Sequence, residues 1–425
     1  MMSAFARVLC AAAALTCVAA PSATPASSPA TRQVVVGYRS ADQLAGLELS
    51  GARIVRKLPA LHRALVETSR PLAGPKPVFR RVLTADEPAL AQTYLPGIAW
   101  EWQWDAARMG EVPDRVLRAA SSVTIAVVDS GADVRAPDLA AKSPATWSVL
   151  SRSRTVSDRL GHGTFVSSLA AGSVENGVGI SGFGGDAKLL VVQAIDADGS
   201  ITDVDEAAAI VFAVKHGAKI VNLSIGGTET SAIEQRAIRW ASRQGALIVA
   251  AAGNEHNEGN PVEYPAALLQ PVGSHGRGGI GLSVGATAMD GTRASFSNTG
   301  SYISLTAPGS NVFAAESGDS DWPHAATPWQ TPGYYGWASG TSFAAPQVAG
   351  VAALVWGANP LLTARQVARV LKQSATGSSW SPELGWGRLD AAATVELALR
   401  TRGDGLRRVS RLAHEPRPTH SSPPS

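Results

Sequence analysis

Cysteine is nearly absent from this chain of 425 residues, which contains only Cys10 and Cys17. Both cysteines lie in an apolar run near the N-terminus, residues 8–20. If that run is removed from the mature protein, as argued below, no disulfide remains to constrain the unfolded chain. We therefore expect packing, or a bound ion, to stabilise the fold.

An excess of charge of one sign is also missing. Charged residues of both signs make up 17% of the chain, and the formal net charge is only +3. Most of this surplus lies in residues 399–425, which are rich in arginine. The remainder is near neutral, which excludes the basic face expected of a nucleic-acid-binding protein. The Ser- and Pro-rich composition of residues 399–425 predicts a disordered basic tail, and such a tail can adhere to a cell surface.

A hydrophobic run long enough to span a bilayer comfortably is missing as well. The run at residues 8–20 follows Arg7 and precedes small residues and proline, which is typical of a secretory signal peptide. We predict a signal peptide over residues 1–26 and a secreted protein. A lipid anchor on Cys17 is the alternative, although Thr16 is bulkier than the residue that such sites prefer.

The next segment has the pattern of a small separate module. Residues 32–70 contain strand-like runs and one helix-like run, at residues 41–49, in the order strand, helix, strand, strand. Residues 71–88 are rich in proline, which predicts a linker open to cleavage. We therefore place an α+β module at residues 32–83.

From residue 95 onward, apolar runs of strand length alternate with helical segments. Continuous apolar strands of this kind indicate a parallel sheet that is covered on both faces. We predict a three-layer α/β domain over residues 95–398, with a mostly parallel sheet between two layers of helices. The apolar segment 343–358 is typical of a buried core helix and not of a membrane span. The predicted strands occupy residues 123–129, 187–195, 219–225, 246–253 and 279–286, and the predicted helices include residues 162–172, 203–217 and 231–245.

Four polar residues stand where these strands end or these helices begin. Asp129 and Asn254 each follow an apolar strand, while His162 and Ser342 each open a helix. Because the carboxyl ends of parallel strands form one crevice, we expect the four side chains to converge there. A serine hydroxyl needs a base, the base needs a carboxylate that orients it, and the reaction needs an oxyanion donor. We predict these roles for Ser342, His162, Asp129 and Asn254, in that order.

Five motifs in the same order carry a family resemblance: VVDSGAD, GHGTFVSSLAAG, IVNLSIGG, AAAGNE and GTSFAAPQVAG. They resemble the motifs of the subtilisin-like serine peptidases, and the chain order Asp, His, Ser is the one known for subtilisin. The resemblance covers residues 95–398. It implies a seven-stranded parallel sheet and a monomeric endopeptidase that cuts peptides or proteins through an acyl-enzyme. It also implies that residues 32–83 are a propeptide that inhibits the enzyme within the same chain.

The resemblance further implies where the substrate binds, docked as an added β-strand. Glu263 aligns with the floor of the pocket for the side chain before the cut bond, and Glu255 follows Asn254. We therefore hypothesise a preference for Lys or Arg at that position. The alternative is that both carboxylates are solvated loop charges. The implied contact residues are Leu223, Ser224, Ile225, Gly226, Ala251, Ala252 and Gly253 for the first pocket, and Asp198, Gly199 and Ser200 for the outer subsites.

A structural calcium site is a second implication of the resemblance. The predicted ligands are the side chains of Asp138 and Asn176 with the carbonyl oxygens of Val174, Val178 and Ile180. Oxygen ligands on a loop suit Ca²⁺. We expect no cofactor for catalysis itself.

Two alternatives to a degradative enzyme remain open. A dedicated processing peptidase of a secretion system, similar to the mycosins, would cut one or few partners, but such proteins typically carry a C-terminal membrane helix. A silent binding scaffold would not need all four catalytic positions to be filled, as they are here. Residues 270–279 and 317–337 look like insertions, and the second, with three tryptophans, forms either an aromatic flap over the cleft or a surface loop.

Overall fold

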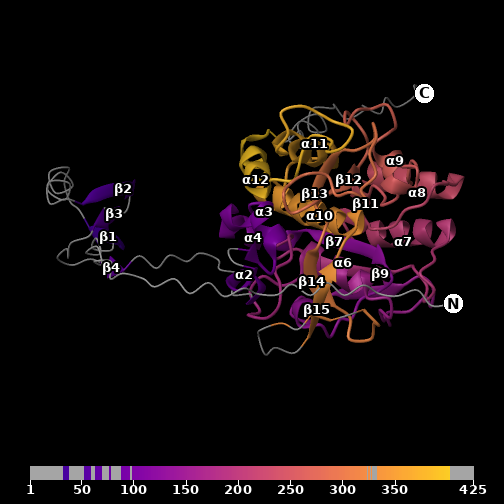
Figure 1. Cartoon of the computed structure of the whole chain (residues 1–425), viewed down its shortest axis with the longest axis horizontal. Coiled ribbons are helices and arrows are strands. Elements are labelled where there is room, and N and C mark those ends of the chain that lie inside the picture. Colours follow the sequence, from indigo (N-terminus) through magenta and orange to yellow (C-terminus); the bar gives the residue numbers. More distant parts are fainter. Residues whose placement is uncertain are drawn as a thin grey trace, which may run out of the picture. The chain divides into compact units, whose positions relative to one another are not determined.

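The computed structural model divides the chain into two compact units, which are described separately (Figure 1). The first comprises residues 1–82 and the second residues 83–425. The predicted signal peptide, the predicted helix at residues 41–49 and the chain after residue 402 lie outside the described residues. The described residues are 32–37, 52–58, 63–68, 76–77, 88–95, 98–322, 324–325, 327 and 333–402.

The first unit contains a four-stranded antiparallel sheet in the order β2-β3-β1-β4. Three strands occupy runs predicted as strands, but β4 lies in the segment predicted as a linker, so that part of the prediction was wrong. β4 pairs Pro77 with Val34 at the edge of the sheet, where a residue without an N–H group is tolerated. The strands are β1 (Arg32–Gly37), β2 (Arg53–Leu58), β3 (Arg63–Thr68) and β4 (Lys76–Pro77).

The second unit is built on a seven-stranded sheet in which every neighbouring pair is parallel, which confirms the predicted α/β fold. The order is β13-β12-β11-β10-β7-β9-β8, so the five strands predicted from apolar runs are adjacent. The two strands that the prediction missed, β8 and β13, form the edges. The strands are β7 (Thr124–Asp129), β8 (Ala145–Ser148), β9 (Lys188–Gln193), β10 (Ile220–Leu223), β11 (Leu247–Ala251), β12 (Leu282–Thr287) and β13 (Leu305–Pro308).

Side chains alternate between two cores, one on each face of this sheet. Ile125 and Val127 of β7 belong to the core that contains α6 and α10, whereas Ala126 and Val128 belong to the core that contains α7 and α8. In Figure 1, α7 and α8 lie together on one side of the unit, and α11 and α12 lie on the other. The main helices are α4 (Asp114–Ala119), α6 (His162–Ala171), α7 (Asp203–Lys215), α8 (Ala232–Arg243), α9 (Ala266–Leu269), α10 (Thr341–Ala358), α11 (Ala364–Ser374) and α12 (Ala391–Arg400).

Shorter elements connect these layers. The hairpin of β14 (Val312–Glu316) and β15 (Tyr334–Ala338) encloses most of the predicted insertion 317–337. The others are α2 (Pro88–Ala91), β5 (Thr93–Leu95), β6 (Ile98–Ala99), α3 (Trp102–Ala106) and α5 (Pro137–Ala140), with 3₁₀ turns at Met109–Glu111, Ala120–Ser122 and His256–Glu258.

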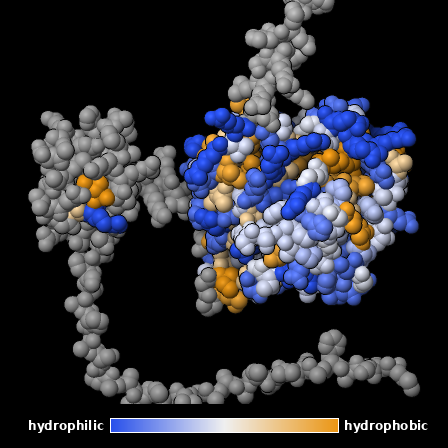
Figure 2. Space-filling view, turned by 90° about the horizontal axis from the view of Figure 1, so that it is seen from above, coloured by the Kyte–Doolittle hydropathy of each residue, from blue (hydrophilic) through white to orange (hydrophobic). Residues whose placement is uncertain are grey.

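Helix α10 runs through the larger core. Among the described residues it is the one helix long and apolar enough to cross a membrane, by length and composition only. Because 83% of its apolar window is buried inside the protein, it has the environment of a core helix. Elsewhere, hydrophilic residues cover most of the face shown in Figure 2, with hydrophobic residues in separate groups.

Candidate functional site

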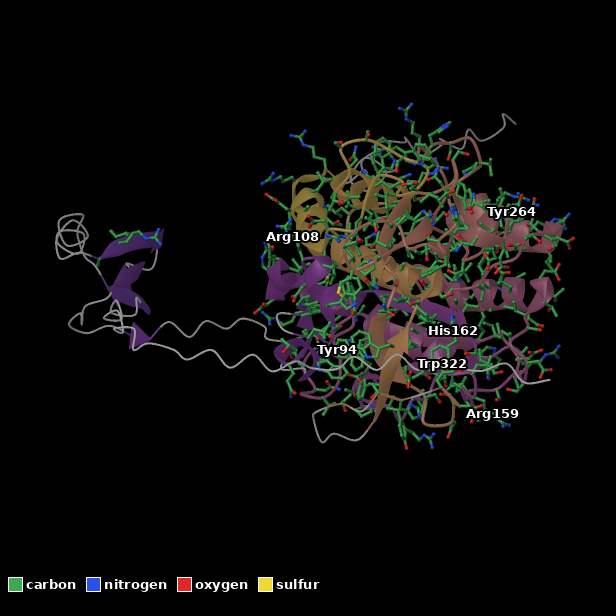
Figure 3. All side chains as sticks on the ribbon, viewed as in Figure 1. Tyr94, Arg108, Arg159, His162, Tyr264 and Trp322 are labelled. Atoms are coloured by element: carbon green, nitrogen blue, oxygen red, sulfur yellow. The ribbon has the colours of Figure 1, made fainter. Side chains whose placement is uncertain are left out.

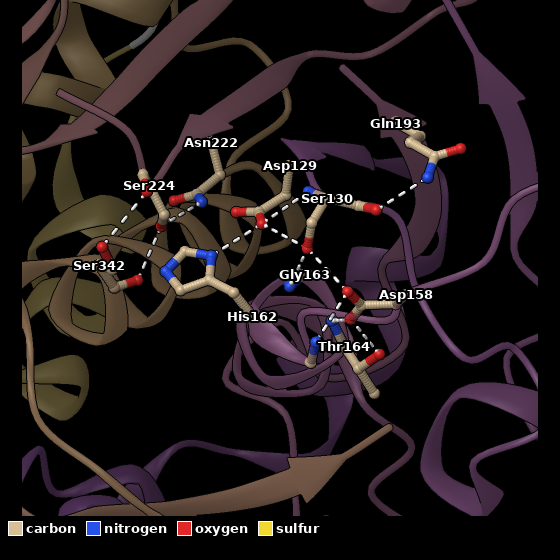
Figure 4. A network of polar contacts seen from close by, with 11 residues as sticks. Asp129, Ser130, Asp158, His162, Gly163, Thr164, Gln193, Asn222, Ser224 and Ser342 are labelled. Carbon is tan, nitrogen blue, oxygen red and sulfur yellow. Dashed lines mark hydrogen bonds and ion pairs between the residues drawn. The ribbon is translucent and has the colours of Figure 1, made fainter. Parts of the chain in front are cut away.

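The carboxylate of Asp129 and the imidazole of His162 form the centre of the site. Asp129 is the fully buried last residue of β7, and its Oδ1 lies 2.7 Å from Nδ1 of His162, the first residue of α6 (Figure 4). The Ser130 N–H also donates to this oxygen, at 2.8 Å, which holds the carboxylate in place. Burial disfavours the charged imidazole, but the charge of Asp129 and its hydrogen bond outweigh burial and raise the pKa of His162.

A second buried carboxylate, Asp158, holds the start of α6. Its Oδ1 accepts hydrogen bonds from the Ser130 hydroxyl at 2.8 Å and from the Gly161 N–H at 2.9 Å. Its Oδ2 accepts the Thr164 N–H at 2.7 Å. Because α6 begins at His162, these bonds fix the backbone that carries the imidazole. Asp158 was not predicted from the sequence, since a carboxylate in a loop is usually a turn residue.

Ser342 is the second residue of α10, and its hydroxyl donates to the carbonyl oxygen of Ser224 at 3.2 Å. The Ser224 hydroxyl donates to the Ser342 carbonyl oxygen at 2.7 Å, and Asn222 Nδ2 donates to that hydroxyl at 2.9 Å. These bonds fix the first turn of α10 against the end of β10. Ser342 and His162 line one cavity of about 390 Å³, and in Figure 4 the imidazole lies between Asp129 and Ser342.

Asn254 lines the same cavity, and its side-chain amide is oriented by Thr341. Asn254 Oδ1 accepts hydrogen bonds from the Thr341 N–H at 2.8 Å and from the Thr341 hydroxyl at 3.0 Å. The Gly253 N–H donates to that hydroxyl at 3.2 Å. Because the oxygen of the amide is held, its Nδ2 group is left to donate to another acceptor, as an oxyanion donor must. This role of Thr341 was not predicted from the sequence, where its place directly before Ser342 was the available signal.

Aromatic side chains form one wall of the cavity. Phe343 packs against His162 with ring centroids 5.5 Å apart, and Trp322 and Trp337 line the same space. Trp322 and His162 are labelled in the same region of Figure 3. Two of the three tryptophans in residues 317–337 therefore face the site, which favours the flap interpretation over the surface loop. The third tryptophan lies outside the described residues.

The elements around this cavity fall in a segment that a known family shares. The profile of the subtilase family matches residues 120–387. The chain belongs to the subtilase family. It is 33% identical to thermitase of Thermoactinomyces vulgaris over 285 residues, which cover 66% of this chain and 91% of thermitase. It is also 33% identical to subtilisin BL of Lederbergia lenta over 275 residues, which cover 65% of this chain and 91% of subtilisin BL.

Solved structures agree with this assignment. A protease from Pseudoalteromonas arctica is 28% identical and superposes with a TM-score of 0.57 over 70% of this chain and 97% of that one. This subtilase is therefore a serine endopeptidase, and its substrates are peptides or proteins.

In this subtilase, the carboxyl group of Glu263 lies between two glycines of the predicted first pocket. A Cβ atom on Gly226 would lie 2.6 Å from Glu263 Oε2, and one on Gly253 would lie 2.5 Å from Glu263 Cγ. Glu263 is 5% exposed, and no residue in the described part of the chain hydrogen-bonds its carboxylate, whereas Glu255 accepts the Asn254 N–H at 2.6 Å. Burial, with the charge of Glu255, raises the pKa of Glu263 to about 7.

The other predicted contact residues lie at strand ends, or in the loops that follow them, at the carboxyl end of the sheet. Leu223 ends β10 and Ala251 ends β11, and the predicted residues after each of them follow in the chain. The turn after β9 is held by Asp196, whose Oδ1 accepts the N–H groups of Asp198 and Ser200 at 3.0 Å each. Contact between any of these residues and a substrate stays a prediction.

The residues predicted to bind calcium lie together, but their contacts do not fit a cation. Asp138 is fully buried, its Oδ1 accepts the Ile180 N–H at 3.0 Å, and its Oδ2 accepts the Tyr335 hydroxyl at 2.8 Å. Asn176 lies in the loop 174–180 and acts against burial by lowering the pKa of this carboxyl group. Calcium would have to displace these donors, because it needs carboxylate oxygens as its own ligands. Among the residues described, no group of three or more His, Cys, Asp or Glu side chains is arranged to hold a metal. Calcium binding stays a prediction that none of these contacts supports.

Proposed function

We propose that the peptidase activity of this chain is carried by Asp129, His162 and Ser342, with Asn254 as oxyanion donor. One observation carries this proposal. The imidazole is held by Asp129 at 2.7 Å and borders the cavity that Ser342 and Asn254 also line. A serine hydroxyl attacks only when a base takes its proton, and His162 is the one histidine among the described residues that line this cavity.

In the proposed reaction, Ser342 Oγ attacks the carbonyl carbon of the peptide bond while His162 accepts the hydroxyl proton. Asn254 Nδ2 and the Ser342 N–H donate hydrogen bonds to the oxyanion that forms. His162 then gives its proton to the leaving amine, so the carbon–nitrogen bond breaks and an acyl-enzyme remains. Water, deprotonated by the same imidazole, hydrolyses the ester. Asp129 stays ionised throughout and stabilises the imidazolium.

A fluorophosphonate probe tests the assignment because it reacts with an activated serine. We expect Ser342→Ala to abolish labelling and to lower turnover on the order of 10⁶-fold, and Asn254→Ala to lower turnover roughly 10²–10³-fold. Ser122→Ala, which changes an exposed serine outside the cavity, should leave labelling and turnover unchanged.

The same experiment separates the alternatives. Labelling that persists in Ser342→Ala refutes the assignment of the nucleophile. A wild-type protein that neither reacts with the probe nor digests casein is a silent scaffold. Labelling without casein digestion, together with cleavage of one or few proteins, indicates a dedicated processing peptidase.

We further propose that the pocket at Glu263 prefers Lys or Arg before the cut bond. Its unpartnered, nearly buried carboxylate supports this preference, because a cationic side chain would compensate its charge. Since the carboxylate ionises as the pH rises through about 7, the preference for Arg over Leu should grow from acidic to alkaline pH. Cleavage rates on matched peptides should show this growing preference for Arg. Glu263→Gln should remove the preference, whereas Glu258→Gln, which changes an exposed residue nearby in the chain, should leave it unchanged. Equal or faster cleavage after Phe or Leu at alkaline pH refutes the proposal.

We also propose that the protein is secreted after loss of residues 1–26, that residues 32–83 inhibit the enzyme until they are cut away, and that the mature enzyme is a monomer. The signal-like run at residues 8–20 and the division of the chain into two compact units, with a boundary after residue 82, support this view. N-terminal sequencing of the exported protein and its mass in solution test it.

A further inference from the structure

A cavity of about 610 Å³ lies apart from the catalytic site. Its walls are one side of α11, the loop at residues 276–280 and parts of the segment 377–386. Among the described residues, none lines both this cavity and the one at Ser342. In Figure 1, α11 lies at the top of the second unit, above α6. The loop belongs mostly to the segment 270–279, which was predicted as an insertion and to which the proposed function gives no role.

Every charged side chain among the described residues that line this cavity is basic. Arg365, Arg369 and Lys372 follow one another along α11 at spacings of four and three residues, so they lie on the same side of the helix. Like charges at such spacings destabilise a helix. Arg277 adds a positive charge from the facing loop. The cavity therefore concentrates positive charge, as an anion-binding site does.

The three arginines of this cavity have no partner in the part of the chain that the structure describes, neither an ion pair nor a side-chain hydrogen bond. Elsewhere, Arg108 and Arg135 each pair with two carboxylates. The chain beyond residue 402 begins near α11, because Gln366 Nε2 donates to the Arg402 carbonyl oxygen at 3.1 Å. By sequence, however, it contains more arginine than Asp and Glu together, so it does not offer the missing negative charge. Exposed guanidinium groups can stay hydrated, so the arginines alone do not require a ligand.

Lys372 differs from them because it is only 8% exposed. Its Nζ donates to three neutral oxygens, those of Gln270 Oε1 at 3.1 Å and of the Gly276 and Gly278 carbonyls at 2.9 Å and 2.8 Å. Burial, with the charge of Arg369, lowers the pKa of Lys372 to about 8. An ammonium group that is buried without a counter-charge destabilises the fold, and an anion in the cavity would offset that cost.

The loop at residues 276–280 supplies backbone donors that suit a phosphate group. Gly276, Gly278 and Gly279 have positive φ angles of 67°, 66° and 82°. The N–H groups of Gly278 and Gly279 donate to no residue that the structure describes. Trp386 Nε1 donates to the Gly276 carbonyl oxygen at 3.1 Å, which helps to hold the loop in place. Free backbone N–H groups in a turn of this kind form a concave site for phosphate.

We propose that this cavity binds a small oligophosphate, a ligand with two or three linked phosphate groups. The guanidinium groups of Arg277, Arg365 and Arg369 would each donate to phosphate oxygens, and the loop N–H groups would donate to others. An oligophosphate matches this cluster better than a side-chain carboxylate does, because it carries several negative charges on a few atoms. The bound ligand would join the loop to α11. This inference is independent of the proposed function, because no catalytic residue takes part.

Isothermal titration calorimetry with tripolyphosphate tests this site. The full chain with Ser342→Ala is used throughout, so that the protein does not digest itself, in a buffer free of divalent cations at about 0.15 M NaCl. We expect one saturable site that binds tripolyphosphate at least about tenfold more tightly than inorganic phosphate or citrate, a tricarboxylate. The unfolding temperature should rise at saturating tripolyphosphate.

Matched variants separate this site from general attraction to a basic surface. Arg365→Gln and Arg369→Gln change exposed side chains, so the protein should still fold, and each should raise Kd about tenfold. Arg236→Gln, which changes an exposed arginine of α8 outside the cavity, should leave Kd unchanged. The inference is overturned if tripolyphosphate does not bind, if citrate binds equally well, or if Kd is the same in all three variants.

Discussion

The imidazole of His162 must be neutral to accept the proton of Ser342, so its pKa decides where activity is lost in acid. Burial works against the charged form, but the charge of Asp129 and its hydrogen bond raise the pKa above the ordinary 6.5. Below its pKa the imidazole is charged and cannot act as a base. We expect kcat/KM to fall with decreasing pH through a midpoint above 6.5, measured with a substrate that does not titrate in this range.

Replacing the carboxylate gives the control for this pH profile. Asp129→Asn keeps the shape of the side chain but removes the charge that raises the pKa, so the midpoint should move down. Turnover should also fall roughly 10⁴-fold, because the imidazole loses its orienting acceptor. A wild-type midpoint below 6.5, or a midpoint that does not move in Asp129→Asn, contradicts this account of the base.

The hairpin β14–β15 contacts the loop 174–180, where calcium was expected to bind. Tyr335 on β15 is nearly buried, donates to Asp138 at 2.8 Å and stacks on Phe313 with centroids 6.1 Å apart. A Cβ atom on Gly179 would lie 2.1 Å from the Tyr335 hydroxyl, so the loop approaches this hydroxyl very closely. Through Tyr335, the hairpin therefore contacts both Asp138 and this loop.

Removal of this hydroxyl should destabilise the enzyme, while removal of metal should not. We expect Tyr335→Phe to lower the free energy of unfolding by about 1–3 kcal/mol, because it leaves a buried carboxylate oxygen without its donor. A chelator should leave the unfolding temperature of the wild type unchanged. Tyr94→Phe, at a half-exposed tyrosine, is the matched control and should have no effect. A chelator-induced loss of stability would support the calcium prediction and contradict this expectation.

Helices and strands could be predicted from the sequence where their own residues carry the signal for the structure that they adopt. The five adjacent strands are apolar because both faces of the sheet are covered, and that signal is local. The edge strand Ala145–Ser148 has four residues and only one fully buried side chain, so its apolar pattern was too weak to find. That Asp129, His162, Asn254 and Ser342 lie close together could be predicted because each stands at a strand end or a helix start.

Roles that depend on contacts between distant residues were not predictable. Thr341 orients an amide 87 residues away in the chain, and Tyr335 reaches a carboxylate 197 residues away. Neither residue type carries a local pattern that indicates such a partner. In the sequence, Glu206 has the pattern of an ordinary carboxylate at the start of a helix. Only the structure shows that it is buried and lines an acidic cavity.

Across the whole molecule, the two units have unequal means of stabilisation. Residues 83–425 contain the two cores on either side of the seven-stranded sheet. The sheet of residues 1–82 has four strands, one of them only two residues long. Both cysteines lie in the predicted signal peptide, so no disulfide would hold the two units together. Once the connection is cut, no covalent bond would join the two units.

This asymmetry leads to a prediction about maturation. If the enzyme cuts its own N-terminal unit away, Ser342→Ala should remain at the size of the uncut precursor, whereas the wild type should lose a fragment that ends within residues 71–88. Gel analysis with N-terminal sequencing measures both products. Addition of active wild-type enzyme to the Ser342→Ala precursor then tells whether the cut can be made by another molecule. Normal processing of Ser342→Ala, expressed alone in a host without related peptidases, would show that the first unit is not removed by this active site.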